Sequence, residues 1–229
     1  GLLVGRRAPR EREQRPCQPP CRAAVDRGRG QVGVQGPPPL LSGQSEPPFA
    51  PVAARLAEVR ACDDERFYWL EDAYKDGGIS QFAHRKLRQL IKTPLLQLEH
   101  LRGLESHVDF IEAEATDFVR GDPDYDGGVT GTMKIAHATE GFGLDVELHG
   151  PGPIRRHIMA SIRNTNYYEM GLVHPKLKPF GSPVYKNYRD TLDAIDKNGC
   201  VDVPEGPGLG VEIDWDYIYK HKTDGTEYK

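Results

Sequence analysis

The sequence predicts an α/β fold in which parallel strands alternate with helices and form part of a barrel. Short apolar segments alternate along the chain with amphipathic segments of helical periodicity, at intervals of 20 to 28 residues. Each apolar segment also ends in an acidic residue or a histidine. Because the carboxyl ends of the strands in a βα barrel face a single pocket, these polar strand ends predict one shared site.

The first helix is expected at residues 51–65, which begin with proline and carry apolar residues at helical spacing. The helix expected at residues 79–92 is amphipathic and has four apolar residues near one face, namely Phe82, Leu87, Leu90 and Ile91. The other expected elements are strand 67–71, strand 93–99, helix 105–114, strand 115–122, helix 128–142, strand 144–149, helix 153–165 and strand 166–172.

Residues 1–50 differ in composition from the rest of the chain. Residues 1–31 hold eight arginines against three acidic residues, and ten of the 19 prolines lie before residue 53. This low-complexity segment has neither helical nor strand periodicity, so we expect it to be disordered or irregular. The partial barrel with its polar strand ends is expected at residues 51–175, followed by a C-terminal extension at residues 176–229.

The overall composition excludes several classes of protein. No apolar run approaches the length of about 18 residues that a membrane span needs, and no N-terminal signal peptide is visible. The formal charge of −4 argues against a general affinity for nucleic acid. Four scattered cysteines indicate a reducing, cytoplasmic environment, and Cys17 and Cys21 lack a second ligand pair at the spacing of a zinc site.

The segment DPDYDGG at residues 122–128 matches the start of a calcium-binding loop. Such a loop needs a bidentate glutamate at its twelfth position, but the twelfth residue counted from Asp122 is Met133. The calcium interpretation therefore fails. Asp124 and Asp126 are expected to form turns or to be solvated, and the two glycines after them let the chain turn into the next helix.

The polar strand ends suit acid–base chemistry beside a cation. Glu71 and Glu99, on neighbouring strands, can hold a hard divalent cation such as Mg²⁺, although either one alone could instead form a salt bridge at the barrel rim. Asp122 next to His149 would fix the tautomer of the imidazole, which suits His149 to act as a general base and then as an acid. Glu169 is expected to stay protonated and to donate to a carboxylate oxygen. Together these groups suit abstraction of a proton next to a carboxylate.

Several motifs resemble the C-terminal part of the enolase superfamily, in the mandelate racemase and muconate lactonizing enzyme group. Between about residue 54 and residue 229 they are FYWLED, LLQLEHLRG, DFVRGDPDYDGGVTGTMKIAHA, GLDVELHGPGP, IRNTNYYEMGLVHP and VPEGPGLGVEIDWDYI. The resemblance implies roughly the C-terminal half of a TIM-type (β/α)7β barrel. It makes Glu71 and Glu99 the second and third Mg²⁺ ligands. It also makes Asp122 and His149 an Asp–His dyad, with Glu169 as the acid on the last strand.

Within this group the motifs look most like those of acid-sugar dehydratases. The resemblance therefore implies a cytoplasmic, Mg²⁺-dependent lyase of carbohydrate acid catabolism, which removes the proton α to a carboxylate and then expels water from a sugar acid. The alternatives are a racemase or epimerase of a hydroxy acid, and a non-catalytic fragment or pseudo-enzyme. The expected partner is a small sugar acid or hydroxy acid, with no nucleic acid or membrane, and a homo-oligomer is compatible with the family.

The resemblance does not extend to the N-terminal cap and the early strands of the family. The first metal-binding aspartate would lie near Gln44, where the sequence has none. Because Mg²⁺ gives up its waters reluctantly, two protein ligands hold it less well than three. We therefore expect this chain alone to be weakly stable, metal-poor and inactive, and residues 176–229 to be an extension that would pack on a capping domain.

Overall fold

The computed structural model describes residues 22–24, 59–60, 62–64, 67–74, 79–170 and 184–225. Strands and helices alternate between residues 70 and 161, while most of the helix expected at 51–65 lies outside the described residues. The elements are β1 Arg22–Ala24, β2 Leu70–Glu71, α2 Gln81–Leu90, β3 Leu95–Gln97, α3 Gly103–Glu112, β4 Phe118–Gly121, α4 Gly128–Gly141, β5 Asp145–Leu148, α5 Pro153–Ser161, the 3-10 helix η2 Leu192–Ala194, β6 Cys200–Asp202 and α6 Trp215–His221.

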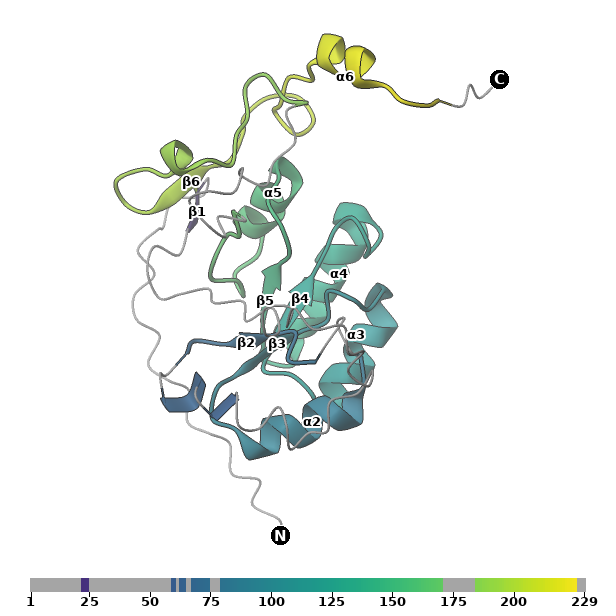
Figure 1. Ribbon diagram of the computed structural model, residues 1–229, viewed down its shortest axis with the longest axis vertical. Coiled ribbons are helices and arrows are strands. Elements are labelled where there is room, and N and C mark those ends of the chain that lie inside the picture. The colour runs from purple at the N-terminus through teal and green to yellow at the C-terminus, as the bar shows by residue number, and fades with distance from the viewer. Residues whose placement is uncertain are drawn as a thin grey trace, which may run out of the picture.

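Strands β2 to β5 form one parallel sheet, in the order in which they occur along the chain. Leu96 of β3 is paired with Glu71 of β2 and with Phe118 of β4, and Phe118 is in turn paired with Asp145 of β5. Figure 1 shows these strands at the centre, with helices α2, α3 and α4 along their outer side. The arrangement confirms the predicted α/β fold of parallel βα units.

A hydrophobic core fills the space between the sheet and its helices. Val119 of β4 and Val146 of β5 are fully buried there, with one large apolar residue from each of three helices, namely Phe110, Ile135 and Ile158. Successive residues of a strand point to opposite faces of the sheet. The residues that alternate with these valines therefore face the inner side, where the polar strand ends lie.

Helix α2 buries a narrower face than its sequence predicts. Leu87 and Ile91 are buried, as is the polar residue His84, but Phe82 is 82% exposed and Leu90 is 39% exposed. The buried positions lie at spacings of three and four residues, which is one row along a helix. The ring of His84 lies edge-on to the ring of Phe110 of α3, whereas Phe82, two positions earlier, lies on the opposite side of the helix.

Residues 166–170 do not form the strand that the sequence predicts, and the side chain of Glu147 holds them instead. The backbone N–H groups of Asn166 and Tyr167 donate to the carboxylate of Glu147 at 3.1 and 3.0 Å, and Nδ2 of Asn166 donates to it at 2.7 Å. A buried carboxylate on β5 thus takes the place of a backbone ladder. These hydrogen bonds to Glu147 hold the segment so that Glu169 lies close to the end of β5.

Part of the segment 184–225 packs on helix α5. Buried Arg156 donates to the carbonyl oxygens of Arg189 and Asp202, each at 2.8 Å, and to the carboxylate of Asp190 at 2.5 Å. Strand β6 pairs antiparallel with β1, a short strand that the composition of the N-terminal segment does not predict. The rest of the low-complexity segment lies outside the described residues. In Figure 1, α6 lies at the opposite end of the molecule from α2, and its packing on a capping domain stays a prediction.

Two further features bear on the expected environment of the chain. Cys200, the first residue of β6, is buried and disulfide-bonded, a bond that the expectation of a reducing environment does not anticipate. Within the described ranges, no helix has both the length and the apolar character that a membrane crossing requires.

Glu147 provides a test of this packing through the pH dependence of stability. Burial raises the pKa of its carboxyl group from 4.5 to about 7, against the effect of its hydrogen bonds and of Arg120. Because this pKa is higher in the folded than in the unfolded chain, the folded chain binds more protons between these pH values. The free energy of unfolding should therefore fall as the pH rises through that window, by about 3 kcal/mol.

Urea denaturation of the parent chain and of Glu147→Gln between pH 4.5 and 7 measures this contribution. The variant cannot ionise at this position, so its stability should fall less steeply with pH. Glu112→Gln, a change at an exposed position of α3, is the matched control and should keep the parental slope. Equal slopes for the parent and Glu147→Gln would contradict the prediction.

Candidate active site

Arg120 on β4 forms the centre of the site because three carboxylates surround its guanidinium group. Its Nε lies 2.7 Å from Oε1 of Glu71 and 3.7 Å from Oε2 of Glu99, and its Nη2 donates to Oε2 of Glu169 at 2.6 Å. The side chain of Arg120 is only 1% exposed. Burial alone would lower the pKa of Arg120, but these carboxylates raise it, so the guanidinium stays charged. Three of the five predicted site residues thus meet at one cation.

Unusual backbone conformations lie next to Glu71 and Glu99, the two glutamates that approach Arg120. Asp72, directly after Glu71, has a φ of 46°, and Leu98, directly before Glu99, has a φ of 113°. Left-handed conformations of non-glycine residues are costly and recur at functional sites. The side chain of Leu98 packs into the hydrophobic core, which leaves Glu99 to face the pocket.

The carboxylate of Glu71 is only partly compensated. Burial raises its pKa to about 7, and Glu169 and Glu99 add to this effect against the charge of Arg120. Its Oε1 is buried and has no hydrogen-bond partner among the described residues, because the nearby Nε–H of Arg120 is not aligned to donate. Carboxylates from two strand ends therefore converge at a point where a further positive charge would be stabilising.

Asp122 and His149 form the hydrogen-bonded pair expected from the sequence. Nδ1 of His149 lies 2.7 Å from Oδ2 of Asp122, and its Nε2 lies 3.7 Å from Oε2 of Glu99. Burial alone would raise the pKa of Asp122, but the hydrogen bonds from His149 and from a backbone N–H, with the charge of Arg155, lower it. The hydrogen bond to Asp122 in turn raises the pKa of His149, more than burial lowers it. Nδ1 is thus engaged, and Nε2 is directed toward the carboxylates.

Oε2 of Glu169 is held as a hydrogen-bond acceptor, and the expected role of this residue as a proton donor stays a prediction. Its Oε2 accepts from Nη2 of Arg120 at 2.6 Å and from the backbone N–H of Gly150 at 2.7 Å. One oxygen of Glu169 is thus occupied by a charge-assisted hydrogen bond and by a backbone N–H. The expectation treated Glu169 as a semi-buried acid and took no account of a buried arginine beside it.

The aspartates in the loop after β4 have separate roles. Oδ2 of Asp126 accepts from the backbone N–H of Asp122 at 2.8 Å, and Asp126 is buried. Its turn-forming role is therefore confirmed, and the solvated alternative is wrong for this residue. Asp124 is largely exposed and reaches an arginine of α5. The two glycines after Asp126 have φ values of 78° and 69°, which fit the expected turn into α4.

Sequence reasoning missed both arginines of the site. Arg120 stands two residues before Asp122, so the two side chains share one face of a strand, and that spacing was the available signal. Arg155 comes after the GPGP loop that begins beyond His149, where only the local abundance of glycine and proline marked an unusual turn.

A second small group lies at the rim of the pocket. Nε2 of His100 is 3.1 Å from Oδ2 of Asp72 and 3.2 Å from Oε1 of Glu99. Among the described residues these three could offer ligand atoms within 4.8 Å of one another. Because it shares Glu99 with the central cluster, this group is an extension of the same site.

The fold and the site define a parallel βα-barrel protein whose strand ends carry a carboxylate cluster and an Asp–His pair. Residues 50–217 match the enolase C-terminal domain-like family, and the chain belongs to that family. This match confirms the enolase superfamily resemblance and the partial TIM-type barrel predicted from the sequence.

The similar proteins include several sugar acid dehydratases. A D-mannonate dehydratase of Caulobacter vibrioides is 27% identical over 74% of this chain and 40% of the relative. A D-gluconate dehydratase of Thermoproteus tenax is 25% identical over 71% of this chain and 32% of the relative. The crystal structure of D-glucarate dehydratase from Agrobacterium tumefaciens complexed with magnesium has a TM-score of 0.66 at 29% identity, over 76% of this chain and 44% of that one. This chain therefore spans less than half the length of each of these relatives.

The central role of Arg120 can be tested by its removal. Arg120→Met would leave the three carboxylates without their shared cation, and we expect it to lower the free energy of unfolding by about 3–5 kcal/mol, measured by urea denaturation at neutral pH. Arg163→Met is the control, because Arg163 is 86% exposed and pairs with Glu140 at the surface. That change should cost less than about 1 kcal/mol. Similar losses in both variants would contradict the assignment.

Proposed function

We propose that this chain supplies the acid–base residues of a Mg²⁺-dependent hydro-lyase, which removes the proton α to a carboxylate and expels water from a sugar acid. The observation that carries the proposal is the position of His149, whose Nδ1 is bound to Asp122 while Nε2 is directed toward Glu99. A base beside a cation-binding pair is what the formation of an enediolate requires. The dehydratase names of the similar proteins support this class of reaction.

Glu71 and Glu99 are the proposed Mg²⁺ ligands, and their environment fits such an ion. Carboxylate oxygens are the protein ligands that Mg²⁺ prefers. Oε1 of Glu71 is buried and accepts no aligned hydrogen bond from the described residues, so a cation bound there would compete only with the ion pair to Arg120. When bound, Mg²⁺ would stabilise the negative charge that develops on the substrate carboxylate as the α-proton leaves.

His149 is the proposed base and acid. Because Nδ1–H of the neutral ring donates to Asp122, Nε2 carries the free lone pair and can accept the α-proton of the substrate. The electrons of the broken C–H bond form a carbon–carbon double bond, while those of the C–O bond leave with the β-hydroxyl group. The imidazolium returns its proton to that leaving group, which departs as water. The enol that remains rearranges to a 2-oxo acid.

In this proposal Glu169 binds and orients the substrate, and Arg120 holds Glu169 in place. Arg120 and the N–H of Gly150 hold Oε2 of Glu169 as an acceptor. An acceptor oxygen that is fixed in this way can take a further hydrogen bond from a hydroxyl group of the substrate. Glu169 therefore favours a substrate that presents a hydroxyl group to the end of β5, as a polyhydroxylated acid can.

The metal-binding part of the proposal is tested by titration of Mg²⁺ into the full chain, monitored by calorimetry. Glu71→Gln and Glu99→Gln each remove a charged ligand and should weaken binding by at least about tenfold. Glu105→Gln, at an exposed position of α3, is the control and should bind as the parent does. Unchanged affinity in both site variants would show that these glutamates are not ligands.

The chemical part is tested by exchange of the α-proton in D₂O, which needs only the base and the cation. The full chain is incubated with Mg²⁺ and a panel of sugar acids, and exchange is measured by proton NMR. A chain with only two Mg²⁺ ligands is expected to be metal-poor and inactive at ordinary Mg²⁺ concentrations, so the test uses saturating Mg²⁺. There we expect slow exchange that falls by about 10²–10⁴-fold in His149→Asn, the usual contribution of a general base. Exchange that is equal in the two proteins, or absent from both, would contradict the role of His149.

The same samples distinguish the two enzyme classes considered for this chain. Formation of a 2-oxo acid identifies a dehydratase. Exchange without loss of water favours a racemase or epimerase of a hydroxy acid instead, because those reactions return the proton to the same carbon.

A further inference from the structure

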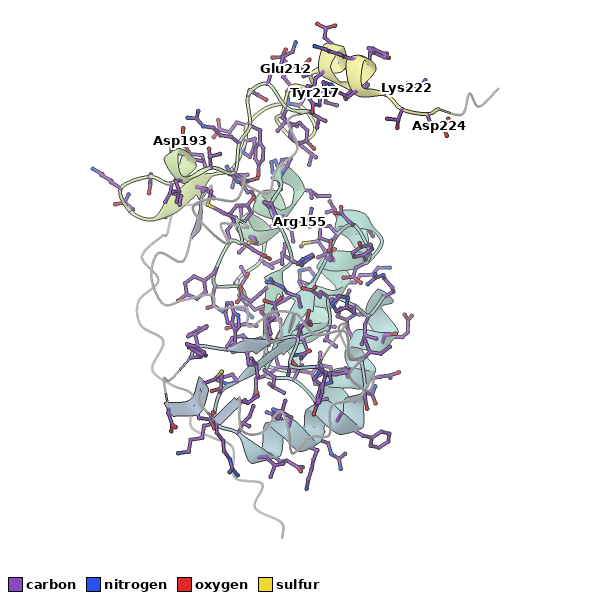
Figure 2. The ribbon with its side chains drawn as sticks, viewed as in Figure 1. Arg155, Asp193, Glu212, Tyr217, Lys222 and Asp224 are labelled. Atoms are coloured by element: carbon purple, nitrogen blue, oxygen red, sulfur yellow. The ribbon has the colours of Figure 1, made fainter. Side chains whose placement is uncertain are left out.

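Arg155 lies behind the Asp122–His149 pair, on the side away from the central carboxylates. It belongs to the first turn of α5, directly after the loop that begins beyond His149, and Figure 2 marks its place on that helix. Its side chain is 9% exposed, although the chain carries arginine elsewhere at its surface. A guanidinium is removed from water only where fixed acceptors compensate its charge.

The guanidinium of Arg155 contacts both members of the pair. Its Nη2 donates to Oδ1 of Asp122 at 2.8 Å, and its Nε donates to the carbonyl oxygen of His149 at 2.6 Å. Nη2 also reaches Oδ2 of Asp124 at 2.7 Å, and the N–H of Asp124 donates to the same Oδ1 of Asp122 at 2.9 Å. Oδ1 of Asp122 is thus held by two donors, which leaves Oδ2 for the imidazole.

The loop between β5 and α5 is shaped around this side chain. Gly150 and Gly152 have φ values of 76° and 138°, which residues with a side chain rarely adopt. A Cβ atom at Gly150 would lie 3.6 Å from Nε of Arg155, and one at Gly152 would lie 3.5 Å from its Nη1. These distances are ordinary van der Waals contacts, so it is the positive φ values that favour glycine at both positions, in the same loop that follows His149.

We propose that Arg155 is a positioning residue that fixes the tautomer and the orientation of His149. It holds Oδ1 of Asp122 and the carbonyl of His149 at the same time, so that Oδ2 stays aligned with Nδ1–H and Nε2 stays free toward the pocket. This inference rests on the role of His149 proposed above, but it concerns a property of the resting chain. A purely structural role for Arg155 would affect stability and leave the tautomer of His149 unchanged.

The tautomer can be read directly from long-range ¹H–¹⁵N NMR spectra of the labelled full chain at about pH 9, where histidine side chains are neutral. The chain holds eight histidines, and the spectrum of His149→Gln identifies the signals of His149. In the parent chain, His149 should be mainly in the Nδ1–H form. In Arg155→Met the ratio of the Nε2–H to the Nδ1–H form should rise by about tenfold, the effect of one lost charge-assisted hydrogen bond.

Arg155→Lys keeps the charge but cannot reproduce the fork of a guanidinium, so its tautomer ratio should lie between those of the parent and Arg155→Met. Arg163→Met, at the exposed arginine, is the control and should leave the ratio unchanged. A folded Arg155→Met with the parental ratio would overturn the inference. If that variant does not fold, Arg155→Lys decides alone, since a ratio equal to that of the parent would also overturn it.

This test is independent of turnover. A chain that shows the expected tautomer shift but no proton exchange would retain the positioning role of Arg155 and refute the proposed reaction. A chain that exchanges the α-proton but shows no shift would refute only the role of Arg155.

Discussion

The guanidinium of Arg120 is the interaction on which the rest of the pocket depends. Removing a charge from water costs several kcal/mol, so an arginine that is 1% exposed persists only among anions. Without it, Glu71, Glu99 and Glu169 would repel one another in a medium that screens charges weakly. A lysine could not replace it, because a planar fork lets Nε approach Glu71 while Nη2 binds Glu169. Arg120 thus sets the distance between side chains from two strand ends and from the irregular segment that carries Glu169.

The two faces of the sheet have different roles, since one packs in the hydrophobic core and the other carries the charged groups of the site. On the outer face, Val119 and Val146 pack against the helices and exclude water. On the inner face, Arg120 and Glu147 alternate with them and carry the charges that organise the pocket. Burial of the apolar face provides the free energy that keeps the polar groups at fixed positions. Leu98 connects the two faces, because its side chain packs in the core and directs the next residue, Glu99, inward.

Periodicity and position along the chain were enough to predict the elements and the strand ends, but not the long-range contacts. Most of the alternating elements and the four polar residues at the ends of β2 to β5 could be predicted from spacing, because strand ends in a βα barrel must converge. Arg120 and Glu147 were missed because a charged residue inside a strand is normally taken to be exposed, and only a partner on another strand makes its burial possible. The strand expected at residues 166–172 was wrong for its described part for the same reason. Its backbone bonds go to the carboxylate of Glu147, which periodicity cannot reveal.

Two arginines divide the acids of this pocket into groups with different protonation behaviour. Arg155 and the N–H of Asp124 surround Asp122, whose pKa is lowered, so this residue stays an acceptor for the imidazole. Burial raises the pKa of Glu71 to about 7, because Arg120, which is shared among three carboxylates, offsets the effect of burial only in part. Acids whose environments separate their pKa values can take separate roles in one reaction. Because His149 contacts Asp122 through Nδ1 and approaches Glu99 through Nε2, it spans the boundary between these groups, where a proton would have to move.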